Sequence, residues 1–187
     1  ENAGIVIAPD QAEGNNVRYA NMAFGQGMDV TMIQTVSAFS AEINGGTYYQ
    51  PRLVAGVRTD DGAVTAKEPV VVKENVISKT SSDQARELIW QGRKTGFLGK
   101  NDRDGYMIGG KTGTSQVIDP KTGEYSDANS IGSYLGFGGV NRPEYVIMVK
   151  VDDAKIGGYQ GTTAAAPIFN DLNNWMLDYL KLQPKRN

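Results

Sequence analysis

One short stretch of this sequence combines a cation, hydroxyl groups and bare backbone. Lys111 supplies a positive charge, Thr112 and Thr114 supply hydroxyls, and Gly113 leaves the chain between them without a side chain. Cations, hydroxyls and closely approachable backbone are the groups that hold an anion, whether a carboxylate or a phosphate. The stretch from 109 to 116 therefore predicts an anion-binding site.

The composition excludes several other kinds of site. The 187 residues include no Cys and no His, which removes Cys nucleophiles, Cys/His zinc sites and His-based catalytic triads. No metal ion and no organic cofactor is implied. The net charge of −2 is unlike the basic balance of a general nucleic-acid binder, so no nucleic-acid partner is expected. With 40% hydrophobic residues, the chain can form a core as one domain or a large part of one.

Capping signals and apolar periodicity predict three helices. Thr31 and Gln34 have the spacing of a capping box at the start of the first, and Ser81 and Gln84 repeat that spacing at the start of the second. The expected helices lie at residues 31–44, 81–94 and 163–180. The last one is expected to bury an apolar stripe at helical spacing. The stripe consists of Ile168, Leu172, Trp175, Met176 and Tyr179.

Strand-like segments lie between and after these helices. Residues 48–57 and 70–76 read as short strands. Three longer strands are expected in succession, and their short connections predict an antiparallel meander. They lie at residues 107–117, 131–140 and 145–151. In the middle strand one face carries several glycines and can accept a closely packed helix. The expected fold class is α/β of the α+β kind, an antiparallel sheet covered by helices.

A phosphate loop is one alternative for the stretch around Lys111. Gly105, four further residues and then Gly110-Lys111-Thr112 satisfy the letters of a nucleotide-binding P-loop. A P-loop must follow a buried strand and open a helix. The residues before Gly105 are mostly charged, and those after Thr112 favour a strand, so the context argues against a nucleotide hydrolase.

The second alternative is a substrate-lining strand of the Lys-Thr-Gly kind found in penicillin-binding proteins and β-lactamases. From about residue 21 to 175 the sequence resembles class B penicillin-binding proteins, specifically the C-terminal half of the transpeptidase domain of a septal or elongation cell-wall synthase. The matching stretches come in the family's order. They are residues 24–27, the capped helix from 31, residues 44–46, 51–54, 111–116, 132–137 and 165–169.

The resemblance implies a β-lactamase/transpeptidase-like fold and roles for four residues. Lys111 would shape the electrostatics near the Ser of the family's Ser-x-Asn motif. Thr112 and Thr114 would face the substrate carboxylate. Gly113 would let the substrate approach, and the backbone N–H of Thr114 would form half of the oxyanion hole. Implied partners are peptidoglycan stem peptides ending in D-Ala-D-Ala, β-lactam antibiotics, the N-terminal part of the same protein and other cell-wall synthesis or division proteins.

The sequence departs from the family pattern in one large respect. No Ser-x-x-Lys and no Ser-x-Asn occurs, so the nucleophile and its base are expected outside this chain, which alone should be inactive. We expect a piece of a longer protein, residues 1–187 forming the C-terminal portion of the domain, with two further sheet strands upstream. It would act on the outer face of the bacterial membrane, anchored from outside this chain. A non-catalytic β-lactam-sensing or partner-binding domain remains the alternative.

Overall fold

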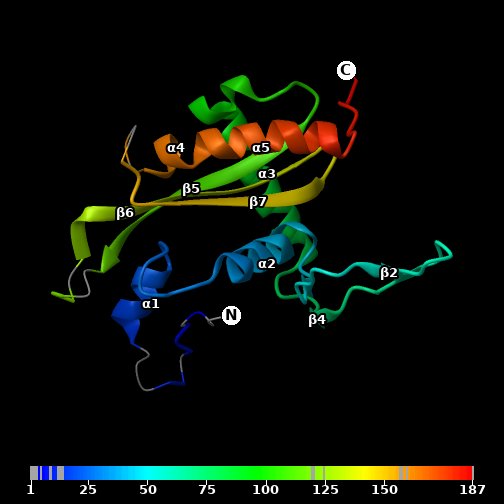
Figure 1. The fold of residues 1–187 in the computed structure, drawn as a ribbon. Helices are drawn as coiled ribbons and strands as arrows, with labels where there is room; N and C mark the ends of the chain where they lie inside the picture. The colour runs from blue at the N-terminus through cyan, green and yellow to red at the C-terminus, as the bar shows by residue number, and fades with distance from the viewer. Residues whose placement is uncertain are drawn as a thin grey trace.

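The computed structural model describes a sheet with helices on both faces and a small hairpin region beside it (Figure 1). The residues described are 4, 6–8, 10–11, 15–118, 121–123, 125–155, 158 and 160–186. The helices are α1 (Asn16–Met22), α2 (Met32–Ile43), α3 (Lys79–Thr95), η1 (Phe97–Asn101), α4 (Gly161–Ala164) and α5 (Ala166–Tyr179). The strands are β1 (Tyr48–Tyr49), β2 (Gly56–Arg58), β3 (Val64–Ala66), β4 (Val71–Lys73), β5 (Met107–Ile118), β6 (Tyr125–Gly139) and β7 (Pro143–Asp152).

The main sheet is an antiparallel meander in the order β5-β6-β7, as the short connections predict. β6 is longer than expected and begins at Tyr125, because β5 runs on to Ile118 and pairs with it there. Side chains alternate between the two faces of each strand. This alternation decides which residues of β5 share a face, and the register decides which residues of β6 lie beside them.

Helices cover both faces of this sheet. On one face α2 and α3 enclose Phe137, whose ring centroid lies 6.3 Å from that of Phe39 in α2. On the other face α5 packs Phe169 against Tyr134, with ring centroids 4.5 Å apart. A Cβ on Gly136 would lie 2.7 Å from the Phe169 ring. The prediction that the glycine-bearing face of the middle strand receives a helix is thus confirmed.

The start of α2 is built by the predicted capping box. The backbone N–H of Gln34 donates to Thr31 Oγ1 (3.2 Å), and the Thr31 N–H donates to Gln34 Oε1 (2.9 Å). These contacts satisfy backbone donors that the first turn of a helix leaves free. The helix ends before Gly45, whose φ of +100° suits glycine.

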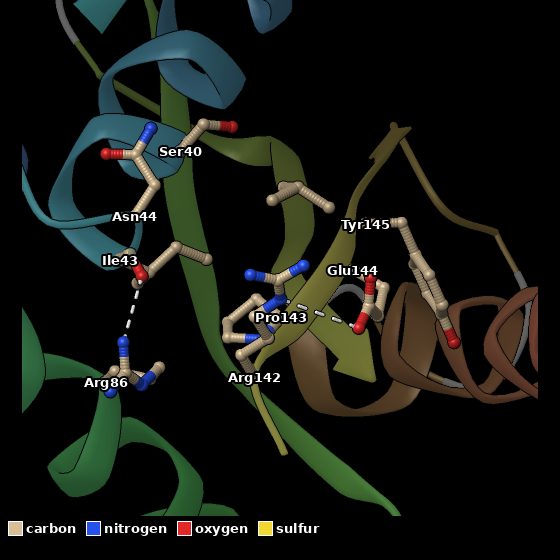
Figure 2. Close-up of a pocket in the computed structure, with 9 residues that line it drawn as sticks. Ser40, Ile43, Asn44, Arg86, Arg142, Pro143, Glu144 and Tyr145 are labelled. Atoms are coloured by element: carbon tan, nitrogen blue, oxygen red, sulfur yellow. Dashed lines mark hydrogen bonds and ion pairs between the residues drawn. The ribbon is translucent and has the colours of Figure 1, made fainter. Parts of the chain in front are cut away.

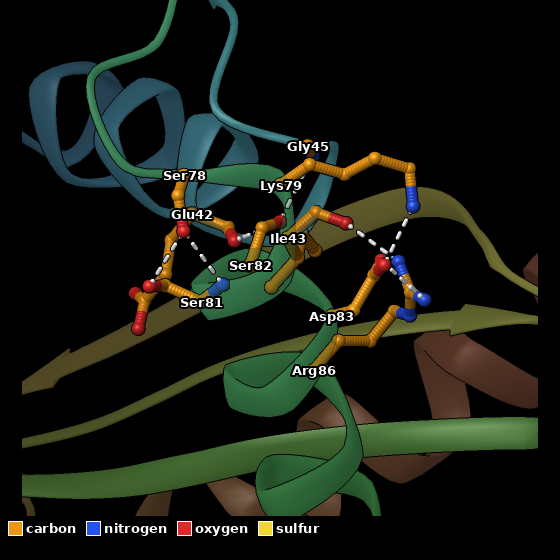
Figure 3. A network of polar contacts seen from close by, with 9 residues as sticks. All are labelled: Glu42, Ile43, Gly45, Ser78, Lys79, Ser81, Ser82, Asp83 and Arg86. Carbon is orange, nitrogen blue, oxygen red and sulfur yellow. Dashed lines mark hydrogen bonds and ion pairs between the residues drawn. The ribbon is translucent and has the colours of Figure 1, made fainter.

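The predicted start of the second helix is wrong. α3 begins at Lys79, and its cap is Ser78, whose side chain accepts from the Ser81 N–H (3.0 Å). Ser81 lies inside the first turn, because an earlier serine offers the same capping chemistry. Ser82 then ties α3 to the end of α2, donating to the Glu42 carbonyl (2.5 Å) and accepting from the Gly45 N–H (2.9 Å) (Figure 3).

The last predicted helix is broken in two. α4 ends at Ala164 and α5 begins at Ala166. Pro167 explains the break, because it has no N–H to donate to the Thr163 carbonyl four residues earlier, so the hydrogen-bonded ladder of the helix cannot run through this point.

The predicted buried stripe of this helix is also wrong. Ile168, Leu172, Trp175 and Tyr179 are exposed, with Trp175 at 56% and Tyr179 at 65%. The buried face instead carries Ala166, Phe169, Asn173 and Leu177. A polar residue can occupy this face because the Tyr145 hydroxyl donates to Asn173 Oδ1 (2.8 Å).

The region between α2 and α3 forms two small antiparallel pairs, β1–β4 and β2–β3. Its strands are shorter than predicted, because Pro51 interrupts the first run. The β2–β3 hairpin projects away from the body of the protein (Figure 1). Within the described part of the chain, no helix is long and apolar enough to cross a membrane.

Candidate active-site strand

The four predicted site residues lie in a row on β5, an edge strand of the sheet. Lys111 pairs with Leu135 of β6 and Thr114 pairs with Gly132. Among the described residues no strand lies along the outer edge of β5. Lys111 and Thr114 are exposed, and Thr112 and Gly113 are half-buried. The strand therefore offers a cation, two hydroxyls and free backbone groups along one open edge.

Lys111 folds over the adjoining peptide unit. Its Nζ donates to the Thr112 carbonyl (2.8 Å) and lies 3.5 Å from Thr112 Oγ1. Within the described part of the chain, no carboxylate forms an ion pair with Lys111. The charge is thus available to an incoming anion at the point where the Thr112 hydroxyl also lies.

At the Thr114 end of the site the strand contacts the start of α4. The Gly161 N–H donates to Thr114 Oγ1 (3.3 Å). A Cβ on Gly161 would overlap the carbonyl oxygens of Gly113 and Ser133. Only a residue without a side chain can bring α4 this close to the two strands. The sequence gives no sign of this contact, because Gly161 sits in a glycine-rich loop that resembles an ordinary connection.

At the Gly110 end of the site the strand packs against Tyr134, which is fully buried. A Cβ on Gly110 would lie 2.5 Å from the Tyr134 ring. The Tyr134 hydroxyl accepts from Arg93 Nη1 (2.6 Å). Burial raises the pKa of Tyr134, and the guanidinium of Arg93 offsets part of that rise.

A largely apolar cavity of about 610 Å³ opens beside the strand, on the side of α2 and α3. Lys111 and Thr112 stand at one wall, and Phe39, Leu88 and Phe97 contribute apolar surface. Leu88 and Phe97 are 73% and 64% exposed. An apolar wall leading to a lysine suits a ligand or chain segment that carries an anionic group.

A second cavity of about 410 Å³ contains two arginines but is a weaker candidate (Figure 2). Arg86 already pairs with Asp83 (2.9 Å) and donates to the Ile43 carbonyl (3.4 Å). Arg142 lies 3.8 Å from Glu144. Because both cations have partners within the protein, this cavity offers less free positive charge than β5 does.

The geometry contradicts the phosphate-loop alternative. Gly110, Lys111 and Thr112 lie inside a strand, whereas a P-loop passes from a strand into a helix N-terminus. The strand also holds no activated nucleophile of its own. Ser115 donates its hydroxyl to the Gln116 carbonyl (3.1 Å), and among the described residues no lysine or carboxylate forms a hydrogen bond with it. Among the described residues no cluster of acidic side chains could hold a metal ion.

Comparison with known proteins supplies the family. Residues 1–174 match the family described as penicillin binding protein transpeptidase domain. Stage V sporulation protein D of Bacillus subtilis is 38% identical over 188 residues, which cover 100% of this chain and 28% of that relative. Penicillin-binding protein PbpB of Mycobacterium tuberculosis is 29% identical over 185 residues, covering 95% of this chain and 27% of that relative.

Among solved structures, penicillin binding protein 3 from Mycobacterium tuberculosis, complexed with ampicillin, gives a TM-score of 0.81 at 28% identity. The match covers 100% of this chain and 42% of that chain. This chain thus spans less than half the length of these relatives. Since the family match extends over most of its residues, the chain belongs to the penicillin-binding protein transpeptidase domain family.

Proposed function

We propose that this chain supplies the Lys-Thr-Gly wall of the active site of a class B peptidoglycan D,D-transpeptidase. The observation that carries the proposal is the row from Lys111 to Thr114 on an open edge strand in a member of this family. The complete enzyme would cross-link stem peptides through a serine acyl-enzyme. Its nucleophile lies outside this chain, which contains no Ser-x-x-Lys.

The substrate is a stem peptide ending in D-Ala-D-Ala, and β-lactams compete for the same strand. Several relatives are named for these activities, among them a probable peptidoglycan D,D-transpeptidase, PenA of Neisseria flavescens. The free C-terminal carboxylate of such a peptide is an anion that Lys111 and the hydroxyls of Thr112 and Thr114 can hold. The site works on the outer side of the bacterial cytoplasmic membrane, where peptidoglycan is assembled.

Each residue of the row has a distinct role in this proposal. Lys111 supplies positive potential, Thr112 and Thr114 donate hydroxyls to the carboxylate, and Gly113 leaves room for the peptide. The backbone N–H of Thr114 stabilises the oxyanion as the serine attacks. A donor of this kind is worth roughly 3–4 kcal/mol when it is lost.

The N-terminal part of the same protein is the partner that completes the site. Within the described residues the outer edge of β7 is unpaired, and the apolar residues of α5 that face solvent form a stripe. Both features suit further strands and a further helix of one domain. Other cell-wall synthesis or division proteins would then bind the assembled enzyme.

Labelling of the full-length parent with a fluorescent penicillin tests the proposal. We expect Lys111→Ala to lower the acylation rate about 100-fold, because it removes the cation at the anion site. Lys79→Ala is the matched control, since Lys79 is an exposed lysine of α3 that pairs with Asp83. Unchanged labelling of Lys111→Ala would refute the role of Lys111. A parent that binds penicillin without acylation would support a non-catalytic sensing domain instead.

A further inference from the structure

Arg93 is a buried cation that the proposed chemistry does not use. It lies in the last turn of α3, and its side chain is 1% exposed. Asp102 receives two hydrogen bonds from it, from Nε (2.8 Å) and Nη2 (2.6 Å). Tyr134 and Asn170 receive one each, at 2.6 and 2.8 Å. Its guanidinium carbon also lies 5.2 Å from the centroid of the Phe169 ring.

These contacts join elements from opposite faces of the sheet. α3 covers one face of β5, where Ile89 lies near Gly109, whereas Tyr134 and Asn170 belong to the face covered by α5. β6 and β7 close the sheet on one side of β5, so the Arg93 side chain must reach Tyr134 past the open edge. Arg93, Gly110 and Tyr134 line the same cavity beside this edge.

The partners of Arg93 bear directly on the site strand. Tyr134 lies against Gly110, the residue before Lys111, and is paired across the strands with Thr112. The position of the Tyr134 ring therefore limits where the backbone on both sides of Lys111 can lie. The ring in turn is held by the hydrogen bond from Arg93 to its hydroxyl.

The chemistry of this cluster supports a geometric role. Burial would lower the pKa of Arg93, but the hydrogen bonds to Asp102 and the nearby charges raise it above its ordinary value, so the side chain stays charged. A buried ion pair adds little stability over apolar packing, yet it fixes directions through its hydrogen bonds. The planar guanidinium holds three partners at set angles, which an ammonium group cannot do.

We propose that Arg93 is a positioning residue of the active site. Through Tyr134 and Gly110 it fixes the position of the backbone of the Lys-Thr-Gly strand. The inference rests on the proposed transpeptidase function and deepens it. Small displacements of a substrate-binding group cost up to about 100-fold in rate. The cluster of Arg93 and Tyr134, which packs against the strand at Gly110, keeps Lys111 and Thr112 in place before substrate arrives.

The limiting rate of acylation of the full-length parent at saturating penicillin, counted per folded molecule, tests this role. We expect Arg93→Lys to lower that rate about 10- to 100-fold. Tyr134→Phe keeps the ring but removes the acceptor, and we expect a smaller fall of about threefold to tenfold. If Arg93→Lys does not fold, Tyr134→Phe, which loses a single oxygen, decides alone. The matched control is Arg103→Lys, because Arg103 also links the same loop to α5, through Asp178, but lies at the surface.

A purely structural role makes a different prediction. In that case Arg93→Lys and Tyr134→Phe would lower the midpoint of thermal unfolding but leave the acylation rate per folded molecule within twofold of the wild type. That result would overturn the inference. Equal losses in Arg93→Lys and Arg103→Lys would overturn it as well. Labelling of the wild type distinguishes a failure of the role of Arg93 from a failure of the proposed function. A labelled wild type with unaffected variants refutes only the role of Arg93, whereas an unlabelled wild type refutes the proposed function and, with it, this inference.

Discussion

At the scale of single residues, the site depends as much on missing side chains as on those present. Lys111 and Thr114 are exposed on β5, while Gly110 leaves room for the Tyr134 ring and Gly161 lets α4 approach the strand backbone. The neighbours of Gly161 are backbone atoms, which cannot rotate away as a side chain could, and the neighbour of Gly110 is the fully buried ring of Tyr134. Small additions at these positions should therefore have large effects.

Gly161→Ala tests this at one position. The new Cβ would overlap the carbonyl oxygens of Gly113 and Ser133, so we expect a loss of about 1–3 kcal/mol in the free energy of unfolding. Gly92→Ala is the control, since a Cβ at Gly92 in α3 meets nothing within 4 Å. It should stabilise the protein by about 0.5–1 kcal/mol, because alanine favours helices. Denaturant unfolding measures both, and a neutral Gly161→Ala would contradict the close approach.

At the scale of elements, short polar signals decide where helices begin. α2 starts at its predicted capping box, but the N-cap of α3 is Ser78 rather than Ser81. Ser78 is the last extended residue before the helix, with φ of −66° and ψ of 151°, as a cap must be. Spacing alone cannot distinguish these two serines, because each is followed by residues that can form a helix.

Paired alanine substitutions separate the two possible starts of α3. We expect Ser78→Ala to lower the free energy of unfolding by about 1 kcal/mol, because the Ser81 N–H loses its acceptor. Ser81→Ala should cost clearly less, since Ser81 supplies no backbone cap. Thermal or denaturant unfolding gives the comparison. An equal or larger cost at Ser81 would show that the helix starts later than described.

The sequence predicts the sheet better than it predicts the packing of its helices. Period-two alternation and short connections are local properties, and they identify β5, β6 and β7 and the row around Lys111. The buried face of α5 depends instead on Asn173, whose partner Tyr145 lies on another element. The network of Arg93 likewise joins residues far apart in the chain. Contacts of this kind leave no periodic signal.

At the scale of the whole molecule, much apolar surface stays open. The solvent-facing stripe of α5 and the outer edge of β7 offer both side chains and backbone groups to a partner. Trp175 and Tyr179 even stack on each other at the surface, with centroids 4.7 Å apart. Surfaces of this kind mark sites of association in proteins of this size.

The chain in isolation should therefore associate or melt without a sharp transition. We expect sedimentation velocity to show a mean mass that rises with concentration. Substituting Leu172→Lys and Trp175→Lys together should reduce that rise, since it places charge on the stripe of α5. Leu53→Lys is the comparison, because it removes an apolar side chain that is fully exposed elsewhere. A monomer at every concentration with a cooperative melt would contradict the expectation.

The contact of Gly161 with the strand also bears on how this protein can evolve. If β-lactams acylate the parent enzyme, drug pressure acts on β5, and an exposed position such as Ser115, whose hydroxyl donates to the neighbouring Gln116 carbonyl, can change without altering the contact with α4. Gly161 has no such freedom, because every other side chain begins with the Cβ that overlaps the strand. Resistance selected in the laboratory is therefore expected to arise along the open edge of β5 and to leave Gly161 untouched.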